Sequence, residues 1–494
     1  MIKVIFLCNF KHFGYEALTH LSNNGIDVKL VSTSPEHKDK TAQCVSPDTI
    51  LLTHDDMNKA VFPIDLKNMG GAPLPVDQEI LEKMSECQSL FIPMMHRLNY
   101  YNISSIKIVG LYYEYLSFWH GVFKAVNPDV IVFHNTPHEG SNYVACHLAQ
   151  QLGIKTLIPE RVLMGDRFFF LDHMYSFPIY TPKDYPALKK ISGTVEVDWL
   201  HRMQKAATQS FKKKSYIDNF FSRLKNKIFR IVDLKGYDYD PIFSLSKSYP
   251  AKSLSKSYPS KLKSRIIAAR SKYLVHKLKK WYKSKSITPN LKCKYIYFPL
   301  HLQPEMTTLP KGRFFWNHQS VLDFLLATMP NNCKIYIKDH PRQFSRSETY
   351  ALLVRDTEFY EKLIENDNVH LIDLEFDSKK LIESSMCVAT ITGTSGWEAM
   401  LSGIPVCVFG YPWYSNCPEA FRVNSVGELK SYLLEVFHGK VVLNQKRLNA
   451  YFHWMREEVS YKAALNPSDV INENKKSNSI TIAKSMIDAI LKVR

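Results

Sequence analysis

A run of small residues in the last third of the chain could hold a phosphate. In Gly393–Val406, Thr394, Ser395 and Gly396 lie between an apolar segment and a helical segment that carries Glu398. Small residues at such a turn let the backbone approach a phosphate, and N–H groups at a helix start carry partial positive charge. A nucleotide therefore fits this turn, with Glu398 accepting hydrogen bonds from ribose hydroxyls. An ordinary strand-to-helix turn without a ligand is the competing interpretation.

A second segment, Lys334–Pro341, ends in a lysine and a histidine. Period-two alternation predicts that Lys338 and His340 lie on the same side of a sheet, and Pro341 prevents the strand from continuing. A lysine as a fixed charge and a histidine as a hydrogen-bond donor or acid suit a phosphate-bearing leaving group. The alternative is a histidine that is simply satisfied by a neighbour.

A third cluster follows the predicted strand Tyr295–Leu300. Its polar loop holds His301, Gln303 and Glu305. We expect this loop to face a cleft between two domains, where His301 and Gln303 would contact a sugar. Glu305 is the catalytic candidate, as base, nucleophile or cation stabiliser. The competing interpretation is an exposed surface carboxylate.

Further candidates follow two predicted strands of the N-terminal third. They are Asn135, His138, Glu139, Glu160 and Arg161. Ligands of parallel sheets bind beyond the carboxyl ends of strands, so these residues are expected at the same cleft. Glu139 is predicted to be catalytic, and the others are predicted to contact sugar or acceptor. Arg161 suits a carboxylate or phosphate on the ligand.

The elements that must position these residues alternate between β-type and helical patterns, which predicts an α/β fold of two doubly wound, Rossmann-like domains. The first-domain strands are expected at Lys3–Leu7, Asp27–Val31, Pro128–Asn135 and Lys155–Ile158, with helices at Phe13–Asn23, Ile106–Val126 and Gly140–Leu152. Second-domain strands are expected at Tyr295–Leu300, Cys333–Ile337, Val369–Leu371, Cys387–Ile391 and Pro405–Phe409, with helices at Gln319–Thr328, Ser378–Ser385 and Trp397–Ser402. The predicted boundaries are residues 1–182 for the first domain, 183–290 for a basic helical connector, 291–427 for the second domain, and 428–494 for a helical tail.

Composition favours a folded protein in a reducing compartment. The chain has 494 residues, 45% of them hydrophobic, which is enough for two domains with their own cores. Nine scattered cysteines without a Cys-x-x-Cys pair argue against a disulfide framework or a zinc site. We identify neither a signal peptide nor an apolar run long enough to span a membrane. The expected location is therefore the cytoplasm.

The net charge of +17 comes from one segment. Phe211–Lys285 holds 21 Lys and Arg against 4 Asp and Glu, so the rest of the chain is neutral. Such a segment attracts anionic lipid headgroups, and we expect peripheral contact with the inner face of a membrane rather than a specific nucleic acid. A solvated connector remains the plain alternative. A nine-residue duplication, Ser244–Pro250 and Ser253–Pro259, lies within it and predicts a flexible loop.

The first three groups of candidate residues, in Gly393–Val406, in Lys334–Pro341 and after Tyr295–Leu300, together resemble the bacterial capsular polysaccharide synthesis family. This family includes β-Kdo glycosyltransferases. The likeness covers most of Lys294–Trp413 and, more loosely, Pro128–Arg161. It implies a GT-B fold, a CMP-activated ulosonic acid donor such as Kdo, a glycan or lipid-linked acceptor, and transfer with retention. The Lys338, His340 and Pro341 element is similar to the family's CMP-binding histidine motif. No cofactor besides the CMP-sugar co-substrate is expected, and no metal, because the Asp238–Asp240 pair lies in the basic connector.

One departure from the family bears on the donor. The family's Gln-x-x-x-Asp motif would place its nucleophilic Asp at Thr307, and a later Gln-x-x-x-Asp, Gln319 and Asp323, is predicted to be helical. Glu305 could replace the missing Asp, or the donor could be another CMP-ulosonate. A polyol-phosphate transferase that uses CDP-glycerol is the enzymatic alternative, and a membrane-binding module is the alternative from another class.

Overall fold

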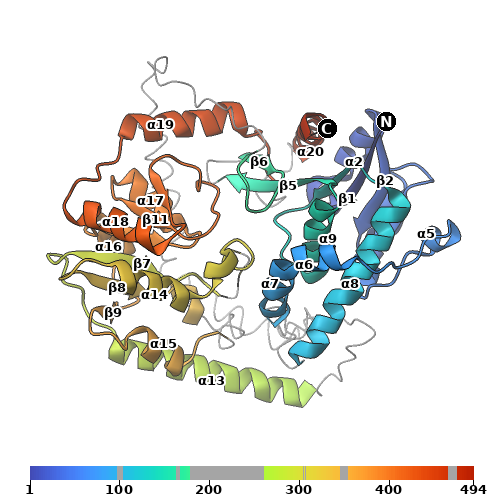
Figure 1. The fold of residues 1–494 in the computed structure, drawn as a ribbon. Coiled ribbons are helices and arrows are strands. Elements are labelled where there is room, and N and C mark those ends of the chain that lie inside the picture. The colour runs from blue at the N-terminus through green and yellow to red at the C-terminus, as the bar shows by residue number, and fades with distance from the viewer. Residues whose placement is uncertain are drawn as a thin grey trace, which may run out of the picture.

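The computed structural model describes residues 1–96, 104–162, 167–178, 261–303, 305, 307–344, 354–465 and 475–493. Two sheets flanked by helices form two domains within these residues (Figure 1). The tandem repeat Ser244–Pro259 and the pair Asp238–Asp240 lie outside the described residues.

The first sheet has six strands in the order β3-β2-β1-β4-β5-β6. They are β1 (Ile2–Leu7), β2 (Ile26–Thr33), β3 (Ile50–Thr53), β4 (Val130–Phe133), β5 (Lys155–Val162) and β6 (Arg167–Leu171). Every pairing is parallel except that of β5 with β6. The strand order reverses between β1 and β4, which is the topological switch point of a Rossmann-like sheet.

Helices cover both faces of this sheet. They are α1 (Phe10–Phe13), α2 (Tyr15–Asn23), α3 (Lys38–Ala42), α4 (His54–Asn58), α5 (Ile64–Asn68), α6 (Gln78–Lys83), α7 (Ser85–Met95), α8 (Ser105–Val126) and α9 (Gly140–Gln151). The helix predicted at Phe13–Asn23 is confirmed as α2, but it begins two residues later than predicted, because Gly14 has a φ of 91° and separates α1 from α2. The predicted helices α8 and α9 are confirmed to within a residue.

The second sheet repeats the same topology, in the order β12-β11-β10-β7-β8-β9. Its strands are β7 (Tyr295–Pro299), β8 (Lys334–Lys338), β9 (Val369–Leu371), β10 (Cys387–Thr390), β11 (Val406–Val408) and β12 (Ala420–Arg422). All pairings are parallel, and the order reverses between β7 and β10. The predicted α/β fold with two Rossmann-like domains is therefore confirmed.

The helices of the second domain include one from the predicted connector. They are α13 (Lys261–Lys285), α14 (His318–Thr328), α15 (Thr357–Leu363), α16 (Ser378–Glu383), α17 (Thr394–Leu401) and α18 (Val426–Phe437), with short 3-10 turns at Arg313–Trp316 and Pro341–Phe344. Val275, Leu278 and Tyr282 of α13 are buried in the same cluster as β7 and β8. Their spacing places them on one face of a helix. The C-terminal part of α13 thus packs as part of the second domain.

The C-terminal segment returns to the first domain. After α19 (Gln445–Trp454) and a π-helical turn (Met455–Val459), α20 (Lys475–Val493) lies against α2 (Figure 1). Ile482, Met486 and Ile490 recur every four residues and are fully buried with Leu18 of α2. The predicted tail is helical, and its last helix completes the core of the first domain.

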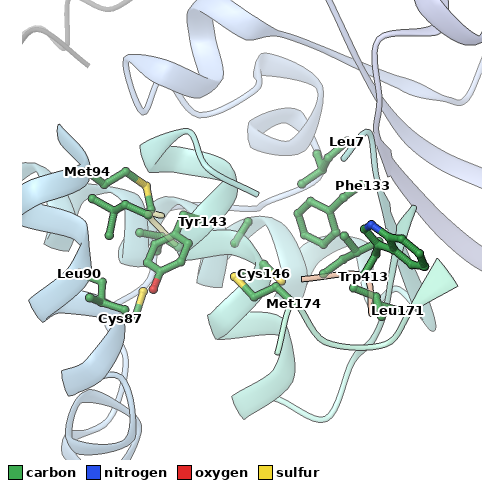
Figure 2. Packing of buried hydrophobic residues seen from close by; sticks show 14 of the residues in the cluster. Leu7, Cys87, Leu90, Met94, Phe133, Tyr143, Cys146, Leu171, Met174 and Trp413 are labelled. Atoms are coloured by element: carbon green, nitrogen blue, oxygen red, sulfur yellow. The ribbon is translucent and has the colours of Figure 1, made fainter. Parts of the chain in front are cut away.

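A continuous apolar cluster joins the two domains. Trp413, in the segment after β11, belongs to the same buried cluster as Leu171 of β6 and Phe133 of β4 (Figure 2). The exposed fraction of Trp413 is 8%. Burial of an aromatic side chain between domains stabilises their contact, so the carboxyl edges of the two sheets are held toward each other.

Candidate functional site

The three clusters of the second domain lie at the carboxyl edge of its sheet. β7 is hydrogen-bonded to β10 on one side and to β8 on the other. The loop after β7, the turn after β10 and the end of β8 therefore come from neighbouring strands, at the switch point where open α/β sheets bind ligands. The structure thus brings together segments that are up to about a hundred residues apart in sequence.

His301 is directly connected to the small-residue turn. Its Nε2 accepts a hydrogen bond from the backbone N–H of Thr392 at 3.0 Å. Burial, followed by the charges of Arg355 and His340, lowers the pKa of His301 to about 3. The ring is therefore neutral, and because Nε2 accepts, its proton sits on Nδ1. Within the described part of the chain, this buried Nδ1 has no hydrogen-bond partner.

The small-residue turn begins α17. Gly393 is the N-cap, and no side chain caps the helix. Thr394 is exposed and Ser395 is half-buried, so the first helical turn faces open space. Gly396 is required by packing, because a Cβ there would lie 2.4 Å from the Tyr414 hydroxyl oxygen. This turn can receive an anion through N–H groups of the first helical turn.

Glu398 lies one turn further along α17. Its side chain is half-buried, and burial raises its pKa, while a hydrogen bond from Thr394 acts in the opposite direction. A carboxylate in this position accepts hydrogen bonds readily, as the predicted ribose contact requires. That role stays a prediction.

Lys338 and His340 are placed differently from the strand-based expectation. β8 ends at Lys338, so period-two alternation does not extend to His340. The Lys338 ammonium donates to the Phe376 carbonyl and, at 2.9 Å, to the Ser378 hydroxyl. Burial lowers its pKa. Lys338 thereby anchors the segment before α16, and phosphate binding by it stays a prediction.

His340 stands in the loop that follows β8. Its backbone N–H donates to Asp339 Oδ1 at 2.7 Å, and its Nδ1 accepts from the Arg342 N–H at 3.2 Å. The ring is half-buried, and its charge contributes to the lowered pKa of His301. His340 and His301 therefore lie in one electrostatic environment at the switch point.

A buried ion pair that sequence reasoning missed supports these loops. Arg355 Nε donates to Asp339 Oδ2 at 2.9 Å, and both side chains are at most 1% exposed. Arg355 also donates to the side-chain oxygen of Gln303 at 2.9 Å and to the carbonyl of His301 at 3.2 Å. One guanidinium thus holds the loops after β7 and β8 together. No periodic pattern surrounds Arg355, so no sequence signal marks it.

Gln303 and Glu305 occupy the loop after β7. The Gln303 amide donates to the Trp316 carbonyl at 2.8 Å and accepts from Arg355, so both its ends have protein partners. Glu305 is half-buried, and its carbonyl accepts from the N–H of Leu309 at 3.2 Å. Thr307, where the family's Asp is expected, contributes its carbonyl as acceptor for the Thr392 hydroxyl. Thr307 therefore contacts the residue directly before the small-residue turn.

The later Gln-x-x-x-Asp does not join this group. Gln319 and Asp323 are four residues apart on α14, and Gln319 donates to Asp323 at 2.8 Å on its outer side. Asp323 is exposed. The pair is an intrahelical hydrogen bond.

The first domain contacts the second through Glu160. Its carboxylate forms an ion pair with Lys311, and it accepts from the Thr136 hydroxyl at 3.2 Å. Both charged side chains are nearly buried, with exposed fractions of 12% for Glu160 and 8% for Lys311. Glu160 thus lies at the domain interface, whereas Arg161 is exposed. The prediction that both residues follow a strand is wrong, because β5 continues to Val162 and pairs them with Phe169 and Phe168 of β6.

Asn135, His138 and Glu139 are half-buried in the loop between β4 and α9. His138 Nδ1 lies 2.8 Å from the Thr136 carbonyl oxygen. The loop is at the switch point of the first sheet, next to the end of β1. Contacts of these residues with a sugar or an acceptor stay predictions.

Three further histidines surround this loop, and sequence reasoning did not identify them. The rings of His12 and His134 are 5.2 Å apart, and His134 stacks on Phe13 at 4.6 Å. Burial lowers the pKa of His134 to about 4 and also lowers that of His54, which Glu139 opposes. The signal that could have indicated His134 is its position directly after a buried strand.

Among the residues that the structure describes, every helix is too short or too polar to span a lipid bilayer. No group of three or more His, Cys, Asp or Glu among them has an arrangement that could hold a metal ion.

Comparison with known proteins gives one family. Residues 260–417 match the family model described as capsule polysaccharide biosynthesis protein. This range contains His301, His340 and the small-residue turn. No curated protein matches the chain.

Solved structures resemble the chain only distantly. Thermosulfurimonas dismutans KpsC, beta Kdo 2,7 transferase, is 11% identical with a TM-score of 0.31, covering 74% of this chain and 89% of that one. UDP-GlcNAc 2-epimerase from Methanocaldococcus jannaschii is 12% identical with a TM-score of 0.24, covering 92% and 99%. TM-scores of this size do not establish a fold shared with these proteins. The assignment of two Rossmann-like domains rests on the topology of the two sheets.

Proposed function

Because residues 260–417 form a capsule polysaccharide biosynthesis domain, we propose that the chain is a glycosyltransferase of capsule synthesis. Its donor is a CMP-activated ulosonic acid, Kdo or a related nonulosonic acid. Its acceptor is a surface polysaccharide or a lipid-linked glycan, and transfer retains the anomeric configuration. No cofactor and no metal take part.

The observation that carries the proposal is the unpartnered Nδ1–H of His301 at the switch point. A buried donor without a partner costs about 1–3 kcal/mol, which a ligand acceptor would offset. The adjoining first turn of α17 supplies further N–H donors, beginning with those of Thr394 and Ser395. Neutral donors and a helix start together suit the phosphate of a nucleotide.

The position of each residue supports a further set of proposed roles. His340 donates to the phosphate, and Lys338 provides positive charge behind it. Glu398 binds the ribose. Glu305 lies in the loop after β7 and is the carboxylate for the reacting sugar, while Glu139, on the first domain, accepts the proton of the acceptor hydroxyl. Electrostatic stabilisation by Lys338 and α17 takes the part that a metal would have in other transferases.

Ligand-induced thermal stabilisation of the full chain tests the donor. We expect CMP to raise the melting temperature more than UDP, GDP or CDP-glycerol, since a ligand that binds only the folded state stabilises it. Stabilisation by UDP alone would overturn the CMP-ulosonate proposal. Formation of a phosphodiester product from CDP-glycerol would instead support a polyol-phosphate transferase.

The exposed face of α13 supports an additional, membrane-binding role. Lys277, Lys280 and Lys283 are exposed, opposite the buried face of the helix. Tyr273 and Leu274, with exposed fractions of 65% and 38%, add apolar contact area. Each lysine near an anionic membrane contributes about 1 kcal/mol. We propose that this face binds the inner surface of the membrane, where a lipid-linked acceptor would be found.

Vesicle pelleting tests this role. The full chain should sediment with phosphatidylserine-containing vesicles, and the charge reversals Lys277→Glu, Lys280→Glu and Lys283→Glu together should release it. The same three reversals must leave CMP stabilisation intact, because these lysines are exposed, opposite the face of α13 that packs on the second domain. Undiminished pelleting of the triple variant would remove α13 from the membrane proposal.

A further inference from the structure

A polar cavity of about 280 Å³ lies between the two domains. On the first-domain side, its walls are the start of α7, the last turns of α9 and the turn after β6. Arg313 and Tyr411 close it from the second domain. A space of this size is near the lower end of small-molecule sites. None of the roles assigned above uses it.

One wall of the cavity contains the buried side chain of His147. His147 is 8% exposed, and its Nε2 has no hydrogen-bond partner among the residues that the structure describes. Burial, followed by the charges of His173 and Arg313, lowers the pKa of His147 to about 3. The ring is therefore uncharged. An orphaned polar atom in a cavity wall is a cost that a bound ligand can offset.

A second histidine supplies a donor of known tautomer. The backbone N–H of Tyr175 donates to His173 Nδ1 at 2.9 Å. Because Nδ1 is the acceptor, a neutral His173 carries its proton on Nε2. The two rings are 6.0 Å apart. His173 Nε2–H and the ring of His147 thus offer neighbouring hydrogen-bonding groups to a single small molecule.

The charged residues of the lining are already paired. Arg313 Nη2 donates to Glu86 Oε2 at 2.6 Å, and Lys83 Nζ donates to Glu79 Oε1 at 2.6 Å. The side chains of Gln150 and Gln151 add neutral amides. A lining of neutral histidines, amides and compensated ion pairs favours an uncharged ligand with several hydroxyls over an anion.

Arg313 joins the cavity to both domains. Its φ of 49° is in the left-handed region, which a residue with a side chain adopts at a cost of about 1–3 kcal/mol. The pair with Glu86 crosses the domain interface, so a ligand in the cavity would contact both domains. Strained residues with such contacts concentrate at ligand sites.

The cavity is set back from the predicted catalytic loop. α9 begins at Gly140, next to Glu139, and His147 lies seven residues along it, about 10 Å at the usual helical rise. We propose that the cavity binds one uncharged pyranose residue of the glycan acceptor, at a distance from the hydroxyl that reacts. The identification of this pyranose as part of the acceptor rests on the proposed function. The binding of an uncharged pyranose in the cavity does not.

Saturation-transfer NMR on the full chain tests the proposal. The probes are the methyl glycosides of glucose, galactose and N-acetylglucosamine, with methyl glucuronoside as the charged comparison. We expect at least one uncharged glycoside to receive saturation and to bind more tightly than the glucuronoside. His147→Phe should weaken that binding about tenfold, since a lost hydrogen bond of about 1.4 kcal/mol corresponds to a factor of ten. Gln151→Trp, which fills the rim from an exposed position, should do the same.

The controls separate binding from folding and from the donor site. His453→Phe makes the same change on the exposed side of α19 and should leave glycoside binding unchanged. Saturation of CMP in the same samples should be equal in all variants. CMP binding without glycoside binding, or glycoside binding that is unaffected by both His147→Phe and Gln151→Trp, overturns the cavity proposal. Glycoside binding without CMP binding supports the cavity and contradicts the proposed donor.

Discussion

The hydrogen bond from the Thr392 backbone to His301 Nε2, 3.0 Å long, connects two loops of the second domain that are 91 residues apart in sequence. It orients the turn in which α17 begins, and it leaves the proton of the neutral His301 ring on Nδ1. The position of one proton at the candidate nucleotide site therefore depends on a backbone contact with a neighbouring strand's loop.

Replacing His301 by Phe should remove the candidate phosphate donor. An aromatic ring is kept, but both the acceptor for Thr392 and the Nδ1–H are lost. We expect the stabilisation by CMP to fall by an amount equivalent to about tenfold weaker binding, as for a lost hydrogen bond of about 1–1.5 kcal/mol. Isothermal titration with CMP measures this directly. Unchanged CMP affinity would exclude His301 from the nucleotide site.

Gly396→Ala should disrupt the small-residue turn. The added Cβ would lie 2.4 Å from the Tyr414 hydroxyl oxygen and 2.9 Å from Thr390 Cγ2, so α17 must move. The matched control is Gly427→Ala near the start of α18, where no atom lies within 4 Å. We expect Gly396→Ala to lose stability and CMP binding. Gly427→Ala should be neutral or stabilised by up to about 1 kcal/mol. Equal behaviour of the two variants would show that the turn tolerates a side chain.

Breaking the Arg355–Asp339 pair should destabilise the second domain strongly. Arg355→Met leaves a carboxylate buried without its counter-charge, which costs about 3–5 kcal/mol. Lys379→Met is the matched control, because Lys379 pairs with Glu383 on the surface at 3.6 Å. Such exposed pairs contribute about 0–1 kcal/mol. Urea denaturation of both variants measures the difference, and a loss below about 1 kcal/mol for Arg355→Met would contradict the supporting role.

The Lys311–Glu160 pair should couple the two domains. In a double-mutant cycle with Lys311→Met and Glu160→Gln, we expect a coupling free energy of unfolding of about 0.5–3 kcal/mol, as for residues in direct contact. Small-angle X-ray scattering should show a larger radius of gyration for each single variant if the pair keeps the domains closed. Additive effects in the cycle together with unchanged scattering would show that the contact is passive.

Stability should decrease in mild acid because of the buried histidines. His147, His301 and His318 are nearly buried, and burial lowers the pKa of each in the folded state. The unfolded chain binds a proton near pH 6.5, whereas the folded chain does so only near pH 3 for His147 and His301. Their contribution is therefore complete above about pH 6.5 and is lost as the pH falls from there, by up to about 1.4 kcal/mol per pH unit for each histidine.

Urea denaturation at several pH values between about pH 7 and about pH 5 measures how the free energy of unfolding changes with pH. His147→Phe should reduce the slope of stability against pH, while the exposed control His453→Phe should not. An identical slope in wild type and His147→Phe would mean that His147 titrates normally in the folded protein.

Local pattern was sufficient for the architecture. Period-two and helical periodicities reflect which side of an element is buried, so β1, α8, α9, β9 and α14 were predicted within a residue or two. The break at Gly14 was missed because the residues on both sides of it continue a helical pattern. The packing of α13 on the second domain was missed because its basic composition concealed the buried face that contains Val275, Leu278 and Tyr282.

Local sequence patterns predict two parallel-sheet domains, the location of the basic charge, and the three motifs at strand ends, because each of these depends on residues that are close together in the chain. Which residues contact one another across the fold is visible only in the structure. The contact of Thr392 with His301, the burial of Arg355 against Asp339, and the cavity around His147 each join segments from different elements. Hydrogen bonds and ion pairs of this kind have no sequence period, since they depend on where the chain returns in space.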